Sequence, residues 1–198
     1  IKPKDIEGNL FMYHLRQLIE DGLVKKMGNE YSLTAGGMRF VQGLSIKTFT
    51  ERIQPKIVTL IGCYDERARW LLYRRKRQPF IGKVGFPYGK IHLGETIKKA
   101  AAREFFEKTG LSVKLLYRGD AYVTVYKDND LISHMLFHIF SGKNPHGNLV
   151  EQSEIGQCFW GEIDRLKPEL YFPGFLDIYK RLQREGKNRF FAEFVYHI

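Results

Sequence analysis

A glycine-rich loop followed by a helix, within residues 89–111, constrains the fold more than any other feature of the sequence. Residues 96–108 are long enough for more than three helical turns and contain three consecutive alanines, which favour helix, and Gly110 is a helix stop. Glu104 and Glu107 are three residues apart, so their side chains project from one helix face. Two carboxylates beside the backbone carbonyls of a preceding loop are the oxygen ligands that Mg²⁺ requires, with waters and substrate phosphates completing its shell.

This segment resembles the signature of the Nudix family, GX5EX7REUXEEXGU, in which U is a bulky apolar residue. Seven residues stand at the required spacings: Gly89, Glu95, Arg103, Glu104, Glu107, Gly110 and Leu111. The preceding residues 85–90 also look like the strand that leads into a Nudix loop. The resemblance covers about residues 57–198 and implies an α/β (α+β) fold, with a mixed β-sheet sandwiched between helices.

The resemblance also implies a reaction, the hydrolysis of a phosphoanhydride bond by water. The expected substrate is a nucleoside diphosphate linked to another moiety, such as ADP-ribose, and the expected cofactor is Mg²⁺ or Mn²⁺. Glu104 and Glu107 would hold the metal, with the Gly89 carbonyl as a further ligand. Arg103 would orient Glu104 by a charge-assisted hydrogen bond. Glu104, Arg103 and Glu107 are thus the expected catalytic residues, whereas Glu95 is expected to be structural, near the helix start.

Basic residues outnumber acidic ones, 32 to 22, and the formal net charge of +10 favours polyanionic partners such as phosphorylated small molecules or nucleic acid. The densest basic cluster flanks the apolar stretch 70–73: Arg67, Arg69, Arg74, Arg75, Lys76 and Arg77. We expect Arg75, together with Lys90 in the signature loop, to contact the substrate phosphates. The aromatic residues that could stack on its base are Phe80, Phe86, Tyr88 and Tyr122, although core packing is the alternative for most of them.

Residues 1–44 form a separate small module. A helix is expected over 9–21 from its apolar spacing, a hairpin over 24–33 with a turn at Gly28-Asn29, and a short helix capped by Thr34 and running through Val41. This order resembles the recognition helix and wing of winged-helix transcription regulators, which usually act as dimers. Arg16 would then face DNA, and Lys25 and Lys26 would meet phosphates. The alternative is a module kept for dimerisation or packing.

Residues 45–56 are a linker, and residues 57–198 form the Nudix-like domain. Its expected strands are 57–64, 70–73, 121–126, 131–140, 159–160 and 189–195, and its expected final helix is 175–184. Cys63 and Cys158 are expected to be buried. His134 and His138 share a strand face, but without a carboxylate or cysteine partner they make a poor metal site. No apolar run approaches ~18 residues and no secretory signal is visible, so we expect a cytoplasmic protein without a membrane span.

Lys108 departs from the signature, because it stands where the family has the second glutamate of the EE pair, a main metal ligand. Its ammonium would compete with a divalent cation, and it could also pair with Glu104 and Glu107 and mimic the charge of the metal. Two functions therefore stay open. The first is a Mg-dependent Nudix pyrophosphohydrolase, favoured because seven signature residues are kept. The second is a nucleotide-sensing winged-helix transcription regulator with a catalytically degenerate Nudix domain.

Overall fold

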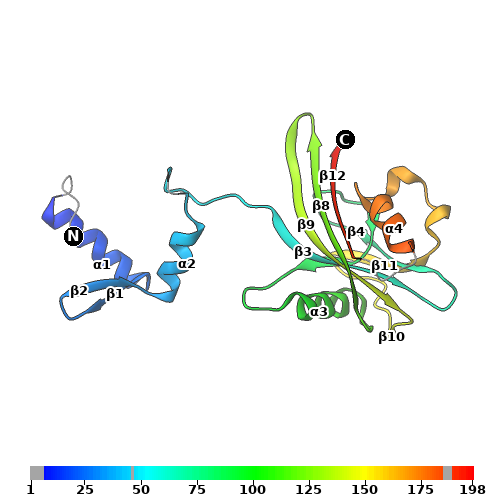
Figure 1. Ribbon diagram of the computed structural model, residues 1–198, viewed down its shortest axis with the longest axis horizontal. Helices are drawn as coiled ribbons and strands as arrows, with labels where there is room; N and C mark the ends of the chain where they lie inside the picture. Colours follow the sequence, from blue (N-terminus) through cyan, green and yellow to red (C-terminus); the bar gives the residue numbers. More distant parts are fainter. Residues whose placement is uncertain (1–6, 46, 185–188) are drawn as a thin grey trace. The chain divides into compact units, whose positions relative to one another are not determined.

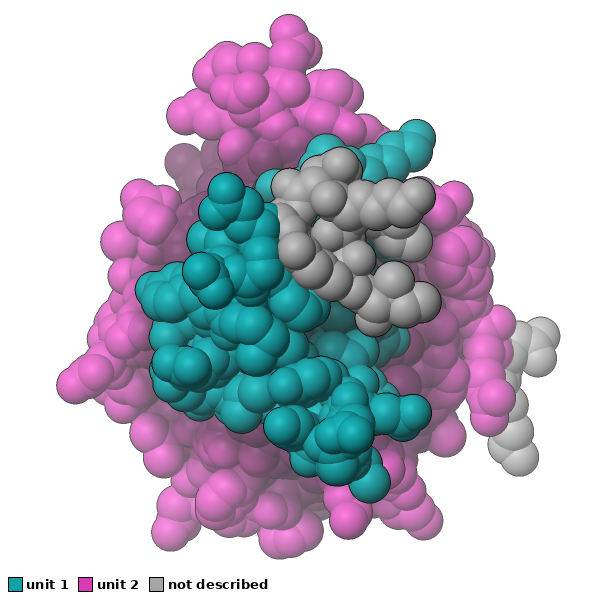
Figure 2. Space-filling model, turned by 90° about the vertical axis from the view of Figure 1, so that its left-hand side faces the viewer, with its two compact units in different colours: residues 1–54 teal, residues 55–198 magenta. Residues whose placement is uncertain are grey.

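The computed structural model of the chain describes residues 7–45, 47–184 and 189–198. Two compact units are present, residues 1–54 and residues 55–198. Figure 1 gives the order of their elements, and Figure 2 distinguishes the two units by colour. Each unit is described by itself.

The N-terminal unit contains a helix, a hairpin and a second helix, as the sequence predicts (Figure 1): α1 Gly8–Glu20, β1 Val24–Met27, β2 Glu30–Leu33 and α2 Ala35–Gly43. Gly28 adopts a φ of 62° in the two-residue turn between β1 and β2, a conformation that glycine reaches without steric cost. The Thr34 hydroxyl accepts the Gly37 N–H at 3.0 Å and caps α2. Each element therefore begins or ends at a residue with a local reason to do so.

The second unit is built on a mixed sheet with the strand order β11-β4-β3-β9-β8-β12, and short strands β5 and β6 pair with β4 and β3. Its strands are β3 Lys56–Tyr64, β4 Trp70–Arg75, β5 Val84–Gly85, β6 Tyr88–Lys90, β8 Leu116–Lys127, β9 Asp130–Lys143, β11 Gly156–Gly161 and β12 Phe190–His197. Two further short strands, β7 Leu111–Ser112 and β10 His146–Gly147, pair with each other. The β3–β9 and β8–β12 pairs are parallel, and the remaining pairs are antiparallel.

Helices α3 (Ile97–Thr109) and α4 (Phe175–Gln183) lie on opposite faces of this sheet (Figure 1). Neighbouring strand residues alternate between the two layers. Leu60 packs in the core that contains α4, and Ile61 packs in the core that contains α3. The expected fold class, a mixed sheet between helices, is confirmed. Two short 3₁₀ helices, Ile163–Arg165 and Pro168–Leu170, precede α4.

The hairpin β8–β9 is longer than the sequence predicts, since its arms extend to residues 116–127 and 130–143 rather than 121–126 and 131–140. Cross-strand pairing carries both strands beyond their apolar centres, from Lys127 opposite Asp130 at the turn to Leu116 opposite Ser141. No helix among the described residues is long and apolar enough to cross a membrane.

Candidate functional site

Helix α3 presents the signature side chains because both its ends are fixed. The Thr96 hydroxyl accepts the Lys99 N–H at 3.4 Å, and Gly110 ends the helix with a φ of 71°. Ala101 and Phe105 are buried against the sheet. This packing fixes the rotation of the helix about its axis, and Glu104 is thereby directed at the signature loop.

Glu104 lies directly against the backbone of Gly89. A Cβ atom at residue 89 would come within 1.7 Å of Glu104 Oε2, so any side chain there would displace the carboxylate. Strand β6 carries Gly89 opposite Thr59 of β3, which places the loop on the sheet beside α3. Glu104 is 8% exposed, an unusual degree of burial for a charged residue. The signature has glycine at this position, and in this chain the reason is steric, because the Glu104 carboxylate occupies the space of a side chain.

Arg103 joins three carboxylates into one network. It donates from Nε and Nη2 to the two oxygens of Glu95, at 2.9 Å each. It also donates from Nη1 to Glu104 Oε1 at 3.1 Å and to Glu107 Oε2 at 3.0 Å. A fifth bond runs from Nη2 to the Lys90 carbonyl at 3.0 Å. The expected hydrogen bond between Arg103 and Glu104 is present within this larger network.

Glu95 ties the signature loop to the helix. Besides its two bonds from Arg103, its carboxylate accepts the His92 N–H at 3.1 Å. The hydrogen bonds from Arg103 outweigh desolvation and lower the pKa of Glu95 to about 2. Its carboxylate is therefore used for structure.

Lys108 contacts the other oxygen of Glu104. Its Nζ donates to Glu104 Oε2 at 2.7 Å, and its side chain is only 15% exposed. The Glu104 carboxylate is thus held between two cations, Arg103 and Lys108. One carboxylate oxygen of Glu107 accepts a hydrogen bond from Arg103, and the Glu107 side chain is 54% exposed. Of the two glutamates with which Lys108 could pair, it pairs with Glu104.

The metal ligands expected from the sequence are Glu104, Glu107 and the Gly89 carbonyl. Among the residues that the structure describes, no group of three or more histidine, cysteine, aspartate or glutamate side chains is arranged to hold a metal ion. Both oxygens of Glu104 accept hydrogen bonds from cations, and the signature position that would add a carboxylate supplies an ammonium. A hard divalent cation needs several anionic or carbonyl oxygens. The residues present therefore do not fit a Mg²⁺ site of the expected kind.

Arg75 and Lys90 were expected to contact substrate phosphates. Arg75 donates to the Tyr88 hydroxyl at 2.9 Å, to the Arg77 carbonyl at 2.7 Å and to the Gln78 carbonyl at 2.9 Å. It thus anchors the loop between β4 and β5 to the strand that leads into the signature. The Lys90 side chain is exposed, and its carbonyl accepts from Arg103. For both residues, contact with a substrate stays a prediction.

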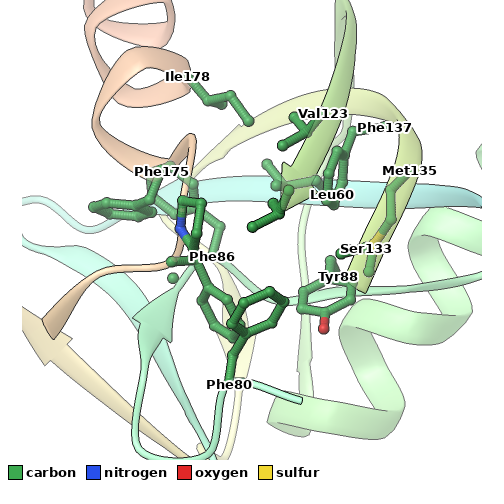
Figure 3. A pocket seen from close by; sticks show the side chains of 14 residues that line it. Leu60, Phe80, Phe86, Tyr88, Val123, Ser133, Met135, Phe137, Phe175 and Ile178 are labelled. Atoms are coloured by element: carbon green, nitrogen blue, oxygen red, sulfur yellow. The ribbon is translucent and has the colours of Figure 1, made fainter. Parts of the chain in front are cut away.

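An apolar pocket lies on the α4 side of the sheet (Figure 3). Met135 and Ser133 of β9 line one side, and Phe175 and Ile178 of α4 line the other. The complete lining is Leu60, Phe80, Gly85, Phe86, Tyr88, Val123, Val125, Ser133, Met135, Phe137, Phe172, Pro173, Phe175 and Ile178. Tyr88 belongs to this lining, and the next residue in the chain touches Glu104. Consecutive strand residues face opposite sides of a sheet, so the pocket and the carboxylate network lie on the two faces of strand β6.

Three of the four aromatic residues named from the sequence line this pocket: Phe80, Phe86 and Tyr88. Tyr122 does not, and its ring instead lies 4.6 Å from that of His134. Sequence reasoning missed Phe137, Phe172 and Phe175. Phe137 could have been found from the strand alternation, since it points to the opposite sheet face from His138.

The expectation that His138 has no carboxylate partner is wrong. Its Nδ1 lies 2.7 Å from Asp120 Oδ1, across the β8–β9 pairing. The two residues are 18 positions apart, and only the register of the hairpin brings them together. In this pair each of the two half-buried polar side chains has a hydrogen-bond partner.

Arg16 of α1 and Lys25 and Lys26 of β1, the residues expected to meet DNA, are all exposed. The Lys26 ammonium lies 5.9 Å from the centre of the Tyr31 ring on the paired strand. These side chains are therefore available in the N-terminal unit, and their contact with DNA stays a prediction.

Comparison with models of known protein families shows to which family this chain belongs. The family model of the NUDIX domain matches residues 54–182, which is more than half of the chain. The chain belongs to the NUDIX family. The match lies almost wholly within the second unit, called the NUDIX unit below, and residues 1–53 lie outside it.

Relatives of the NUDIX unit include proteins with named activities. The chain is 29% identical over 151 residues to a protein named ADP-ribose pyrophosphatase from Methanocaldococcus jannaschii, covering 73% of this chain and 86% of that protein. It is 33% identical over 112 residues to an oxidized purine nucleoside triphosphate hydrolase from Danio rerio, covering 56% of this chain and 69% of that protein. Nudix hydrolases generally use divalent metals such as Mg²⁺.

Solved structures share the fold of the NUDIX unit. The MutT protein of Bacillus halodurans superimposes with a TM-score of 0.58 at 24% identity, covering 72% of this chain and 90% of that one. The NUDIX domain of Shewanella oneidensis NrtR, solved with ADP ribose, superimposes with a TM-score of 0.56 at 16% identity, covering 76% and 97% of the two chains. At these identities the likeness is one of fold.

Proposed function

We propose that the NUDIX unit binds a nucleoside diphosphate linked to another moiety, of the ADP-ribose type, and does not cleave it by a metal-dependent reaction. The observation that carries this proposal is the hydrogen bond of 2.7 Å from Lys108 Nζ to Glu104 Oε2. It occupies the carboxylate that a catalytic cation would need. Of the two functions left open by the sequence, ligand sensing is the one that this geometry supports best.

The charge of the site explains why binding and cleavage separate. Hydrolysis of a diphosphate requires its negative charge to be neutralised while a water is positioned and deprotonated. In this network Arg103 and Lys108 offset two of the three carboxylates, Glu95, Glu104 and Glu107. Such a site attracts an anion more readily than the acidic signature of the family would, and it offers less to a divalent cation.

The apolar pocket supplies the second half of the proposed ligand site. Rings of Phe80, Phe86, Tyr88, Phe137 and Phe172 are among its lining, and aromatic side chains stack favourably on flat ring systems. With a nucleobase in this pocket, the diphosphate would extend around the edge of strand β6 to the signature loop on the other face. The name of the Methanocaldococcus relative, ADP-ribose pyrophosphatase, supports this class of ligand.

The second candidate function is the Mg²⁺- or Mn²⁺-dependent hydrolysis itself. The retained network of Arg103 with Glu95, Glu104 and Glu107 favours it, as do the hydrolase names of the relatives. Under this alternative Lys108 weakens the reaction without abolishing it.

We further propose that the N-terminal unit is part of a winged-helix module that binds DNA, and that the chain acts as a homodimeric, ligand-responsive transcription regulator. The helix, hairpin and helix order and the exposed Arg16, Lys25 and Lys26 support this proposal. A bound nucleotide would shift DNA binding only by its differential affinity for the two states of the protein.

The deciding experiment measures binding and turnover on the same samples. ADP-ribose, NADH, dinucleoside polyphosphates and nucleoside triphosphates are each tested by calorimetry for binding, and by product analysis with Mg²⁺ or Mn²⁺ for cleavage. We expect at least one ligand to bind without turnover above the level of Glu104→Gln. We expect cleavage to appear in Lys108→Glu, which restores the signature. The matched control is Lys98→Glu, the same charge change at an exposed residue of α3.

Turnover by the unmodified protein well above that of Glu104→Gln would contradict the sensing proposal and support the hydrolase. Absence of binding for all these compounds would contradict both functions of the NUDIX unit.

A further inference from the structure

We infer that the Lys108 ammonium takes the place of the divalent cation as the positive group that receives the diphosphate of the ligand, so that binding needs no metal. This inference rests on the proposed ligand binding and states how the same site achieves it. Lys108 is then a binding residue of the site as well as an obstacle to metal binding.

The position of the ammonium is fixed before any ligand arrives. Lys108 follows Glu104 by one helical turn, and Glu104 is itself fixed by its contact with Gly89 and by Arg103. The Lys108 side chain is 15% exposed, so its alkyl stem is packed. The Cys158 thiol also donates to the Lys108 carbonyl at 3.3 Å, which ties the end of α3 to β11. Little side-chain entropy remains to be lost when an anion binds.

The ammonium keeps hydrogen-bonding capacity for a ligand. A lysine ammonium has three N–H donors. Within the described part of the chain, the hydrogen bonds of Nζ go to Glu104 Oε2 alone. Two donors thus remain for phosphate oxygens, and part of the side chain is open to solvent.

A divalent cation meets the opposite situation. A cation that approached Glu104 Oε2 would lie close to the ammonium, which repels it, and would have to displace a hydrogen bond of 2.7 Å. The substitution at residue 108 therefore acts twice, since it removes an anionic ligand and places a positive charge at the site. Both effects favour a phosphate anion over a metal ion.

The first test compares affinities with and without metal. Calorimetry with ADP-ribose and, separately, with inorganic pyrophosphate is run in EDTA and in excess Mg²⁺. For the unmodified protein we expect dissociation constants that agree within about twofold between the two conditions. Lys108→Gln, which keeps a polar side chain one atom shorter and removes its charge, should weaken binding in EDTA by about tenfold. Lys98→Gln should leave affinity unchanged, and thermal melting verifies that all variants fold.

The second test measures metal binding without any ligand. Mn²⁺ titration followed by electron paramagnetic resonance should show binding to Lys108→Glu, and much weaker binding to the unmodified protein and to Lys98→Glu. Equal Mn²⁺ affinity in the unmodified protein and Lys108→Glu would overturn the inference. A requirement for Mg²⁺ in ligand binding, or an unchanged affinity in Lys108→Gln, would also overturn it while leaving the proposed ligand binding intact.

Pyrophosphate separates the two ideas. Binding of pyrophosphate in EDTA that depends on Lys108, with no binding of ADP-ribose, would contradict the proposed nucleotide ligand and keep the role of Lys108. Failure of both probes to bind would overturn both.

Discussion

Glu104 is a nearly buried carboxylate, and its partners decide what it can do. A buried charge is costly unless it is paired and hydrogen-bonded, and here Arg103 and Lys108 meet the two carboxylate oxygens. With a carboxylate at residue 108 the same Glu104 would face a second negative charge, which a metal would have to neutralise. Under the proposed function, a change at one residue thus moves the site from cation binding towards anion binding.

Glu95 makes the acid stability of the NUDIX unit depend on Arg103. Its pKa is lowered from 4.5 to about 2 in the folded protein, chiefly by hydrogen bonds from Arg103. The resulting stabilisation is present above the unfolded value and is lost as the pH falls from 4.5 through 2. Glu95→Gln should therefore flatten the fall of unfolding free energy in this range. Urea unfolding at a series of pH values measures this free energy. If it changed with pH equally in Glu95→Gln and in the unmodified protein, the pairing of Glu95 with Arg103 would be contradicted.

Cys63 and Cys158 should be unreactive in the folded protein. Burial raises the pKa of Cys63 to about 12 and that of Cys158 to about 11, so the reactive thiolate is scarce at neutral pH. A chromogenic disulfide reagent at pH 8 should detect both thiols in denaturant and react very slowly with the native protein. Rapid modification of either thiol under native conditions would show that its surroundings open.

At the scale of the element, α3 depends on the glycine that ends it. Gly110 combines a left-handed φ of 71° with a close approach, because a Cβ there would lie 2.4 Å from the Asn148 carbonyl oxygen. The helix end and the chain leading out of β10 are therefore packed backbone to backbone. The geometry of Glu104 and Lys108 depends on this packing, since both lie in the last two turns of the helix.

We expect Gly110→Ala to destabilise the NUDIX unit by clearly more than the ~1 kcal/mol typical of an alanine at positive φ, because the steric clash adds to the backbone strain. The matched control is Gly94→Ala, where φ is 81° and nothing lies within 4 Å of the added Cβ. Both tryptophans, Trp70 and Trp160, belong to this unit, so their fluorescence reports its urea unfolding alone. Equal losses of unfolding free energy in the two variants would show that the loop around Asn148 moves to accommodate the added methyl group.

At the scale of the whole molecule, the chain joins two compact units with different chemistry. The NUDIX unit carries the carboxylate network and the apolar pocket, and the N-terminal unit carries exposed basic side chains on α1 and the hairpin. Residues 1–56 contain nine basic and six acidic residues, a modest excess that limits the electrostatic part of any DNA binding.

The DNA-binding proposal predicts a shallow salt dependence that the basic residues account for. Fluorescence anisotropy with a random-sequence duplex should show affinity that falls with salt. The triple variant Arg16→Ala, Lys25→Ala, Lys26→Ala should bind more weakly and reduce the slope of log K against log salt by up to about 3. A control with Lys127→Ala and Lys143→Ala, exposed lysines of the NUDIX unit, should bind unchanged. Equal losses in the two variants would place any DNA contact elsewhere.

Local chemistry made the signature helix and the N-terminal elements predictable. Thr96, Gly110, Thr34 and Gly28 act through short-range hydrogen bonds and backbone preferences, so the elements they bound were found to within a few residues. The departure of Lys108 from the signature was also predictable, because a signature compares residue types at fixed spacing. Its repulsion of a cation and its pairing with glutamate followed from its charge.

Tertiary packing decided what local patterns leave open. The pairing of Lys108 with Glu104 is a local i,i+4 contact within α3. The burial of Glu104 against Gly89 is not local, because strand β6 brings this glycine to the helix from 15 residues earlier in the sequence. The partnership of His138 with Asp120 needed the hairpin register, and the pocket needed α4 to lie across the sheet. These contacts join segments far apart in the chain, and their geometry follows from strand order and core packing, for which a single sequence carries no short-range signal.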